Sequence, residues 1–388
     1  MARKVKIPPL PDFGDFVQYD DDVNSAYDEN GNRYRLGQHN RSLGLLVDFT
    51  RLALFTQGPV FLRRMDRSGK FVHTDESKIA RFFGAIHMFV EDLYSKDLFY
   101  SPDIALFFEC YRVHRIRNCL LKDKQGTVHD GLTEADVYED FVAFYRAEAK
   151  RLRIKKKLAD WAKNTVENVK RIREYVDALF ERYARLVFVR VEFLYKEAVV
   201  PAAEIGVTHE KLVMLAARDQ LEFLKGNDED RVPENLTRVN ETQAMEDRDH
   251  FFRNLRSKPS LFAHMVGYIW SMEWTPVGGY HFHTAFIFDG SKVQKHEYLA
   301  ELIGKYWAQD IKGGRGHYHN CNRNKYPDYL LGPTEYHETD KRERLLKVLC
   351  YLAKKEQFVQ VKRSVKAKVF GTGKIRKRIL RLGRPRRK

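Results

Sequence analysis

Apolar residues in the first half of the chain recur with the period of an α-helix. Between residues 75 and 95 they lie three and four positions apart, as on one helix face: Ile79, Phe82, Phe83, Ile86, Phe89, Val90 and Leu93. Residues typical of helix N-termini precede three other apolar runs: Ser42 before Leu43–Phe55, Ser101-Pro102-Asp103, and Thr133-Glu134-Ala135-Asp136. We predict an irregular N-terminal segment over residues 1–40 and a helical accessory domain over 41–184.

Near residue 185 the pattern becomes typical of strands. Leu186–Tyr195 is rich in β-branched and aromatic residues, and Ala263–Trp274 and Tyr280–Phe288 flank a turn with proline and glycine. Helical spacing occurs over 209–224, 295–307 and 341–357, whereas 226–247 is acidic and loop-like. This order of strand, helix, hairpin, helix, short strand and helix predicts an α+β fold. We expect a mainly antiparallel sheet flanked by helices over 185–360.

The predicted hairpin carries a His-x-His pattern. Residues two apart on a strand project to the same face, so His281 and His283 can reach one divalent ion. If Trp274 pairs with Tyr280, Glu273 lies opposite His281 on that face, and a shift of one residue points it away. Two imidazoles and a carboxylate suit Mg²⁺ or Mn²⁺ when phosphate oxygens complete the shell. An isolated His-x-His is more often two ordinary surface histidines.

A tyrosine on the last predicted helix is a candidate nucleophile. Tyr351, Lys354 and Lys355 lie three and four apart and therefore share one helix face. A tyrosine hydroxyl can attack phosphorus when a metal and a lysine lower its pKa and neutralise the phosphate. A lone tyrosine on an amphipathic helix is more often a residue at the rim of the core.

The net charge of +16 is concentrated at the C-terminus. Residues 361–388 hold thirteen basic side chains and no acidic one, which leaves a net charge of only +3 on the first 360 residues. A solubilising or membrane-surface tail is one interpretation, but in a chain without a lipidation signal we favour nucleic acid, bound by counterion release. The candidate DNA-binding residues of this polycationic tail are Lys362, Arg363, Lys366, Lys368, Lys374, Arg376, Lys377 and Arg378.

Composition excludes several other classes of protein. With 43% apolar and 31% charged residues the chain is neither disordered nor a membrane protein. No apolar run approaches the roughly 18 residues of a membrane span, and Pro8, Pro9 and Asp12 stand where a signal peptide needs apolar residues. The four cysteines form no CxxC pair. We expect a cytoplasmic protein with free thiols and no membrane partner.

Two further patterns carry weaker hypotheses. His317, His319 and Cys321 have strand spacing and could ligate zinc, although no fourth ligand is evident. Three tryptophans could stack on unpaired bases but are more often core residues: Trp270, Trp274 and Trp307.

The ordered set of motifs resembles known families. His-hydrophobic-His on a strand, followed by a helix with Tyr-x-x-Lys, resembles the HUH superfamily of single-strand endonucleases that start rolling-circle replication. The chain is similar, more closely, to YagK/YfjJ-type proteins, which are similar to replication initiators of inoviruses (filamentous phages) and their prophage and plasmid relatives. The resemblance covers about 186–373 and rests on Val189–Glu192, Gly267–Trp274, Gly279–His283, His319–Asn322, Tyr351–Phe358 and Phe370–Gly373.

This resemblance implies a metal-dependent HUH nickase. His281 and His283 would bind Mg²⁺ or Mn²⁺, with Glu273 as third ligand and Glu192 as a weaker candidate. Tyr351 would attack a phosphodiester of single-stranded or hairpin origin DNA, leaving a 5′-phosphotyrosyl bond and a free 3′-OH, and Lys354 or Lys355 would steady the phosphate.

The resemblance also implies host helicase and polymerase as partners. Because only one tyrosine lies near this position, the way in which the displaced circle is closed stays open. Two other functions are compatible with the same residues: a non-catalytic DNA-binding regulator on the same fold, and a conjugative relaxase or transposase.

Overall fold

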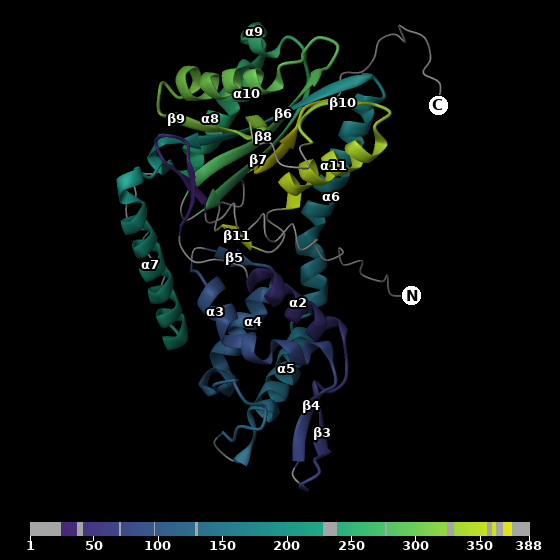
Figure 1. Cartoon of the computed structure of the whole chain (residues 1–388), viewed down its shortest axis with the longest axis vertical. Coiled ribbons are helices and arrows are strands. Elements are labelled where there is room, and N and C mark those ends of the chain that lie inside the picture. Colours follow the sequence, from purple (N-terminus) through teal and green to yellow (C-terminus); the bar gives the residue numbers. More distant parts are fainter. Residues whose placement is uncertain are drawn as a thin grey trace.

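The helices of the first half of the chain enclose one apolar core, shown in the lower half of Figure 1. The computed structural model describes residues 25–36, 42–69, 71–96, 98–128, 131–227, 239–275, 278–323, 330–354, 359–361 and 368–374. The core lies between α2 (Ser42–Phe55), α3 (Ile86–Leu93), α4 (Pro102–Val113) and α5 (Glu134–Arg151). We call this part the helical lobe.

Most of the predicted helices of this lobe are confirmed. The seven apolar residues of 75–95 are all buried, although the segment divides into a 3₁₀ helix, Lys78–Ala85, followed by α3. Thr133 and Asp136 form a capping box at the start of α5, as their spacing predicts. The hydroxyl of Ser42 bonds to the carboxylate of Asp92.

The helical prediction missed three strands in this lobe. The strands β3 (Phe61–Met65) and β4 (Phe71–Asp75) form an antiparallel hairpin, and β5 (Leu98–Tyr100) pairs with β11 (Val359–Val361). The reason for the first error is turn chemistry. The Asp66 carboxylate accepts the backbone N–H of Ser68, and Gly69 adopts a φ of +79°, so the chain reverses there instead of continuing as a helix.

One long helix, α6 (Ile154–Phe180), joins the helical lobe to the second half of the molecule (Figure 1). Its start belongs to the helical core through Ile154 and Leu158, whereas Ile172 to Phe180 pack against the sheet described next. The helix begins after Arg153, whose left-handed backbone (φ +53°) separates it from α5.

The second half of the chain forms an antiparallel six-stranded sheet, so the fold is α+β as predicted. The order is β10-β6-β8-β7-β12, and β9 also pairs with β6. The bounds are β6 Arg185–Tyr195, β7 Met265–Thr275, β8 Gly279–Asp289, β9 Gly316–Asn320, β10 Gly332–Glu335 and β12 Phe370–Thr372. The hairpin register is confirmed, because Trp274 pairs with Tyr280 and Glu273 with His281.

Both faces of this sheet are covered by helices. The first face carries Phe193 and Phe286, and it packs against α8 (Glu241–Arg253), α10 (His296–Lys305) and the π-helical turn Tyr306–Ile311, which contributes Trp307. The second face carries Phe188 and Ile287 and packs against α6 and α11 (Thr339–Lys354), so we call it the α11 face. We call the sheet with these helices the sheet lobe.

Several segments outside the expected elements also join the fold. The N-terminal strands β1 (Ser25–Tyr27) and β2 (Arg33–Arg35) pair in a region predicted to be irregular. The acidic segment 226–247 contains the start of α8, which Asn240 caps by accepting the N–H of Gln243. Residues 368–374, which the sequence assigns to the tail, include β12 and so extend the sheet.

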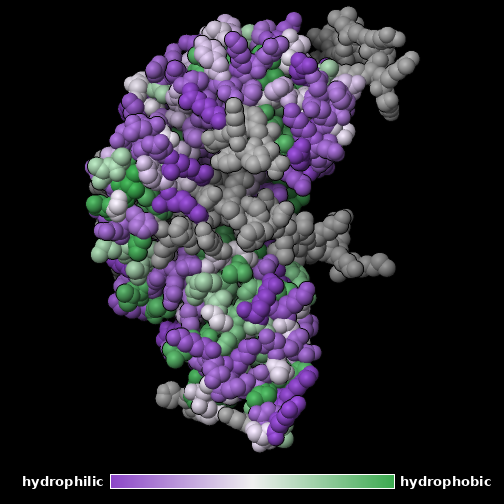
Figure 2. All heavy atoms as spheres, in the orientation of Figure 1, coloured by the Kyte–Doolittle hydropathy of each residue, from purple (hydrophilic) through white to green (hydrophobic). Residues whose placement is uncertain are grey.

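The helix α7 (Ile205–Lys225) leaves part of its apolar surface exposed. Val207, Met214 and Leu221 are 54%, 73% and 55% exposed, and Figure 2 shows hydrophobic residues gathered at the left edge, where Figure 1 places this helix.

Within the described residues, no helix combines the length and the apolar character that a membrane crossing requires. All four cysteines are free thiols, as expected.

Candidate metal centre and the adjoining groove

The two histidines of the His-x-His pattern lie side by side on the α11 face. Odd-numbered residues of β8 point to this face, because Ala285 and Ile287 belong to its core. The rings of His281 and His283 have centroids 4.9 Å apart, and the two residues are only 5% and 2% exposed. They are therefore not ordinary surface histidines.

A carboxylate from the neighbouring strand completes the cluster. The Oε2 atom of Glu273 lies 3.1 Å from Nε2 of His283 and 3.8 Å from Nε2 of His281. One ligand atom from each of the three residues lies within 4.8 Å of the others. In an octahedral shell with bonds of about 2.1 Å, adjacent ligand atoms are about 3 Å apart. The three side chains can thus hold one small divalent cation after slight movement.

Hydrogen bonds on the far side of each ring orient the two imidazoles. Nδ1 of His281 donates to the carbonyl oxygen of Gly279 at 3.0 Å, and Nδ1 of His283 donates to Oε1 of Glu192 at 3.0 Å. With their protons on Nδ1, neutral rings direct the Nε2 lone pairs at the Glu273 carboxylate. These acceptors repel one another unless a proton or a cation lies between them, and one divalent cation satisfies all three. This is the usual support of metal-binding histidines.

Glu192 lies behind the cluster rather than within it. The sequence makes it a weaker candidate ligand, but its carboxylate contacts the outer nitrogen of His283, accepts from Arg190 Nη2 at 3.3 Å and accepts from the Tyr27 hydroxyl at 3.2 Å. Burial alone raises the pKa of Glu192. The hydrogen bond from His283, the positive charge of that ring when it is protonated and no cation is bound, and the charge of Arg190 outweigh burial and hold that pKa well below its ordinary value. Glu192 is therefore a buried anion.

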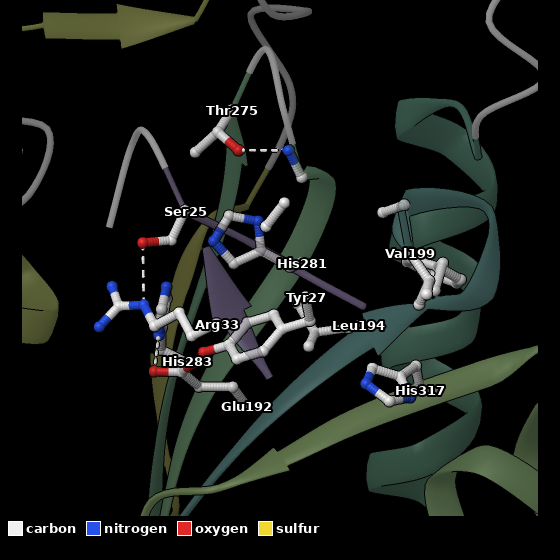
Figure 3. Close-up of a pocket in the computed structure, with 14 residues that line it drawn as sticks. Ser25, Tyr27, Arg33, Glu192, Leu194, Val199, Thr275, His281, His283 and His317 are labelled. Carbon is white, nitrogen blue, oxygen red and sulfur yellow. Dashed lines mark hydrogen bonds and ion pairs between the residues drawn. The ribbon is translucent and has the colours of Figure 1, made fainter. Parts of the chain in front are cut away.

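The N-terminal hairpin β1–β2 covers this side of the histidines (Figure 3). Tyr27 stacks on His319 with ring centroids 5.0 Å apart, and Arg33 donates from Nε to the Ser25 hydroxyl. A cavity of about 30 Å³ remains between the hairpin and His281. That volume holds an ion or one to two waters but no nucleotide.

A larger groove opens on the other side of Glu273. It encloses about 250 Å³ and is bounded by α6, β7, the end of α11 and the start of β12. Glu273 and Ser271 form its floor on β7, and Leu352 and Ala353 belong to its α11 wall. A substrate in this groove therefore lies against the same carboxylate that faces the His pair.

The predicted nucleophile lies on the helix that covers the His-bearing face. Tyr351 is 3% exposed near the end of α11, and its neighbours Leu352 and Ala353 line the groove. Tyr351 itself is among the lining residues of neither cavity. Lys354 is the last residue of α11 and is half-buried, whereas Lys355 lies outside the described residues.

Few of the predicted DNA-binding residues can be placed. Lys368 and Lys374 are described, and Lys368 Nζ lies 5.9 Å from the centroid of the Trp270 ring. The other predicted residues lie outside the described part of the chain: Lys362, Arg363, Lys366, Arg376, Lys377 and Arg378.

The weaker sequence hypotheses have different outcomes. His317 and His319 lie on β9, where His319 pairs with Glu192, and burial lowers the pKa of both imidazoles. Within the described residues, Glu273, His281 and His283 form the one cluster with three potential ligands, so the zinc hypothesis for Cys321 finds no support there. Trp270 and Trp307 are core residues, 5% and 0% exposed.

With this geometry established, comparison with known proteins gives one family. A family model, the YagK/YfjJ C-terminal domain, matches residues 148–373, more than half of the 388 residues. The chain belongs to this family. The YagK/YfjJ domain begins near the end of α5 and includes α6, all six strands of the sheet, the His pair and α11. No curated protein and no solved structure matches the chain.

Two residues near the centre of this YagK/YfjJ domain escaped the sequence prediction. Tyr27 precedes the matched region by more than a hundred residues and reaches Glu192 only because the chain folds back. Trp161 lies on α6 and lines the groove beside Glu273. A polar stripe on α6 is the one signal that could have indicated it, since Trp161, Asn164 and Asn168 are three and four residues apart.

Proposed function

We propose that this chain nicks and rejoins single-stranded DNA at a replication origin and so initiates rolling-circle replication of a phage, prophage or plasmid. The observation that carries the proposal is the convergence of His281 Nε2, His283 Nε2 and Glu273 Oε2 on the sheet face that α11 covers. Mg²⁺ or Mn²⁺ bound to these atoms would supply positive charge to the scissile phosphate. Membership in the YagK/YfjJ family is compatible with this function.

In the proposed reaction each side chain has one task. His281 and His283 bind the cation through Nε2, and Glu192 holds the ring of His283 in the required tautomer. The Tyr351 hydroxyl loses its proton and attacks phosphorus. The new O–P bond forms as the bond to the 3′ oxygen breaks, and that oxygen takes up a proton. Lys354 stabilises the phosphate charge. The products are a 5′-phosphotyrosyl bond and a 3′-OH that a host polymerase can extend, and the reverse reaction rejoins the strand.

The test is a nicking assay on the full-length chain. The substrate is a supercoiled plasmid that carries the DNA flanking this gene, incubated with Mn²⁺, Mg²⁺ or a chelator. We expect metal-dependent conversion to open circle and a covalent protein–DNA adduct that survives denaturing electrophoresis. Tyr351→Phe should remove the adduct but leave DNA binding intact, because the change deletes the nucleophile and little surface. Tyr336→Phe, in the loop before α11, is the matched control and should keep the adduct.

Each alternative has its own result in this assay. An adduct that persists in Tyr351→Phe assigns the nucleophile to another residue, and Tyr27 is then the first to test because it lines the cavity beside His281. Nicking that persists in the His281→Ala/His283→Ala double variant refutes the metal centre. If the chain binds DNA but does not cleave it with any metal, the result supports the alternative function, a non-catalytic DNA-binding regulator on the same fold.

A further inference from the structure

The groove beside Glu273 carries the side chains of a single-strand binding site. Residues of one face of α6 line it, at spacings of three and four: Trp161, Asn164, Thr165, Asn168 and Arg171. Within the described residues, the side chains of Asn164, Asn168 and Arg171 make no hydrogen bond or ion pair, so their polar side-chain atoms are available to a ligand. The set comprises an aromatic surface, two amides and a guanidinium.

A buried hydroxyl in the groove provides an independent observation. Ser271 is 5% exposed, lines the groove from β7, and its Oγ atom has no hydrogen-bond partner among the described residues. A buried polar atom of this kind indicates a missing partner. Ser271 also pairs directly with His283 across β7 and β8. The unsatisfied hydroxyl is therefore adjacent in the sheet to a residue of the metal cluster.

Both acidic and basic side chains line the groove: Glu167 and Glu273 are its carboxylates, and Arg171 is its cation. Glu167 is the one carboxylate that α6 contributes, and its Oε1 atom lies 4.0 Å from Nζ of Lys163. Lys163 and Lys170, which are 70% and 74% exposed on the same helix, do not line the groove, and Lys170 pairs with Glu174. Lys368 is exposed next to the lining residue Val369. A volume of about 250 Å³ is close to the roughly 300 Å³ at which small-ligand sites begin. One nucleotide, rather than a duplex, fits this space.

We propose that the groove binds an unpaired nucleotide of single-stranded DNA adjacent to the scissile phosphate. The base stacks on Trp161, Asn164 and Asn168 bond to the base edge, and Arg171 and Ser271 contact phosphate oxygens. The location next to the scissile bond rests on the proposed function, because Glu273 separates the groove from the His pair. Binding of single-stranded DNA in the groove does not require cleavage.

The experiment measures binding in the absence of catalysis. A fluorescently labelled single-stranded oligonucleotide is titrated with the full-length chain in EDTA and followed by anisotropy. We expect Trp161→Ala to weaken binding about 5- to 150-fold, the range that loss of one base–aromatic stack gives. Trp161→Phe keeps an aromatic face and should bind within about threefold of wild type. Val166→Ala, on the same helix but outside the groove, is the matched control and should not change affinity.

The possible outcomes separate this proposal from the proposed function. If Trp161→Ala and Val166→Ala bind the oligonucleotide with equal affinity, and circular dichroism shows that both are folded, the proposed nucleotide-binding groove is refuted even if the wild type nicks DNA. Weak binding by Trp161→Phe as well as Trp161→Ala also overturns it, because stacking is then not the cause. A selective loss in Trp161→Ala supports the groove, and it does so even if no metal yields an adduct.

Discussion

Replacing Glu192 with glutamine tests whether the hydrogen bond behind His283 supports metal binding. Glutamine has nearly the same shape and its amide oxygen can still accept from Nδ1, so the substitution removes the negative charge but not the contact. Arg190, whose guanidinium contacts Glu192 at 3.3 Å, keeps its positive charge. In the variant, His283 is therefore less basic, and the positive charge of Arg190 near the bound cation is no longer neutralised by Glu192.

The magnitude follows from the distances. Glu192 Oε1 is 3.0 Å from His283 Nδ1, and adding the ring and a metal–nitrogen bond places its charge about 7 Å from a bound cation. Removing one negative charge at about 7 Å from a dication costs about 1 kcal/mol at the dielectric constant of water and about 5 kcal/mol at an effective value of about 20. Loss of an outer hydrogen-bond partner typically weakens metal binding 10- to 100-fold, or about 1.4–2.7 kcal/mol, which lies within these limits. Because the Arg190 charge remains, we expect the upper part of that range.

The assay is calorimetric titration of the full-length chain with MnCl₂ at neutral pH. Glu335→Gln is the matched control, since it removes the carboxylate of the ion pair that Glu335 forms with Arg185 at the other end of β6. We expect Glu335→Gln to bind Mn²⁺ as the wild type does. A dissociation constant for folded Glu192→Gln within threefold of the wild-type value would show that the carboxylate does not support the site.

Three further predictions concern the hairpin, a helix cap and the tail. Tyr27→Phe should lower the free energy of unfolding by about 1.5 kcal/mol because it removes the hydrogen bond to the Glu192 carboxylate. This is the low end of the range for a charged acceptor, since the bond is long at 3.2 Å. An unchanged urea midpoint would contradict this prediction. At Asp136, burial raises the pKa, but bonds from Thr133 and His73 outweigh it and lower that pKa. The stabilisation is complete above the unfolded value near 3.9 and is lost as pH falls through the folded pKa. Asp136→Asn should thus cost about 1 kcal/mol at pH 7 and much less at pH 3 in paired urea titrations, and an equal cost at both would refute the capping role. Removing 375–388, with eight basic residues, should reduce the log–log salt slope of single-strand affinity by up to about 6. An identical slope would exclude residues 375–388 as a DNA contact.

The predicted fold was wrong where the local pattern of apolar and polar residues does not determine the secondary structure. The hairpin β3–β4 depends on the turn residues Asp66 and Gly69, and the helix α8 depends on the capping residue Asn240. These residues lie in polar stretches where apolar positions recur with no clear period. The edge strand β12 has three residues, and its pairing with Ser271 to Ile269 depends on β7 and not on its own sequence. Short strands acquire their structure from a partner strand, so a window on the chain does not reveal them.

Sequence alone determined the central features of the candidate site. Period-two alternation placed His281 and His283 on one face, and it placed Glu273 beside them on the condition that Trp274 pairs with Tyr280. The structure confirms that register, which depends only on residues next to the turn. Only the tertiary structure decided that Glu192 and Tyr27 lie behind His283 and that Trp161 faces the groove beside Glu273. These contacts join segments about 90 to 250 residues apart. The burial of apolar residues of α6 against the sheet, and of Ala26 and Leu36 against Val200, brings these segments together, and no local pattern encodes that burial.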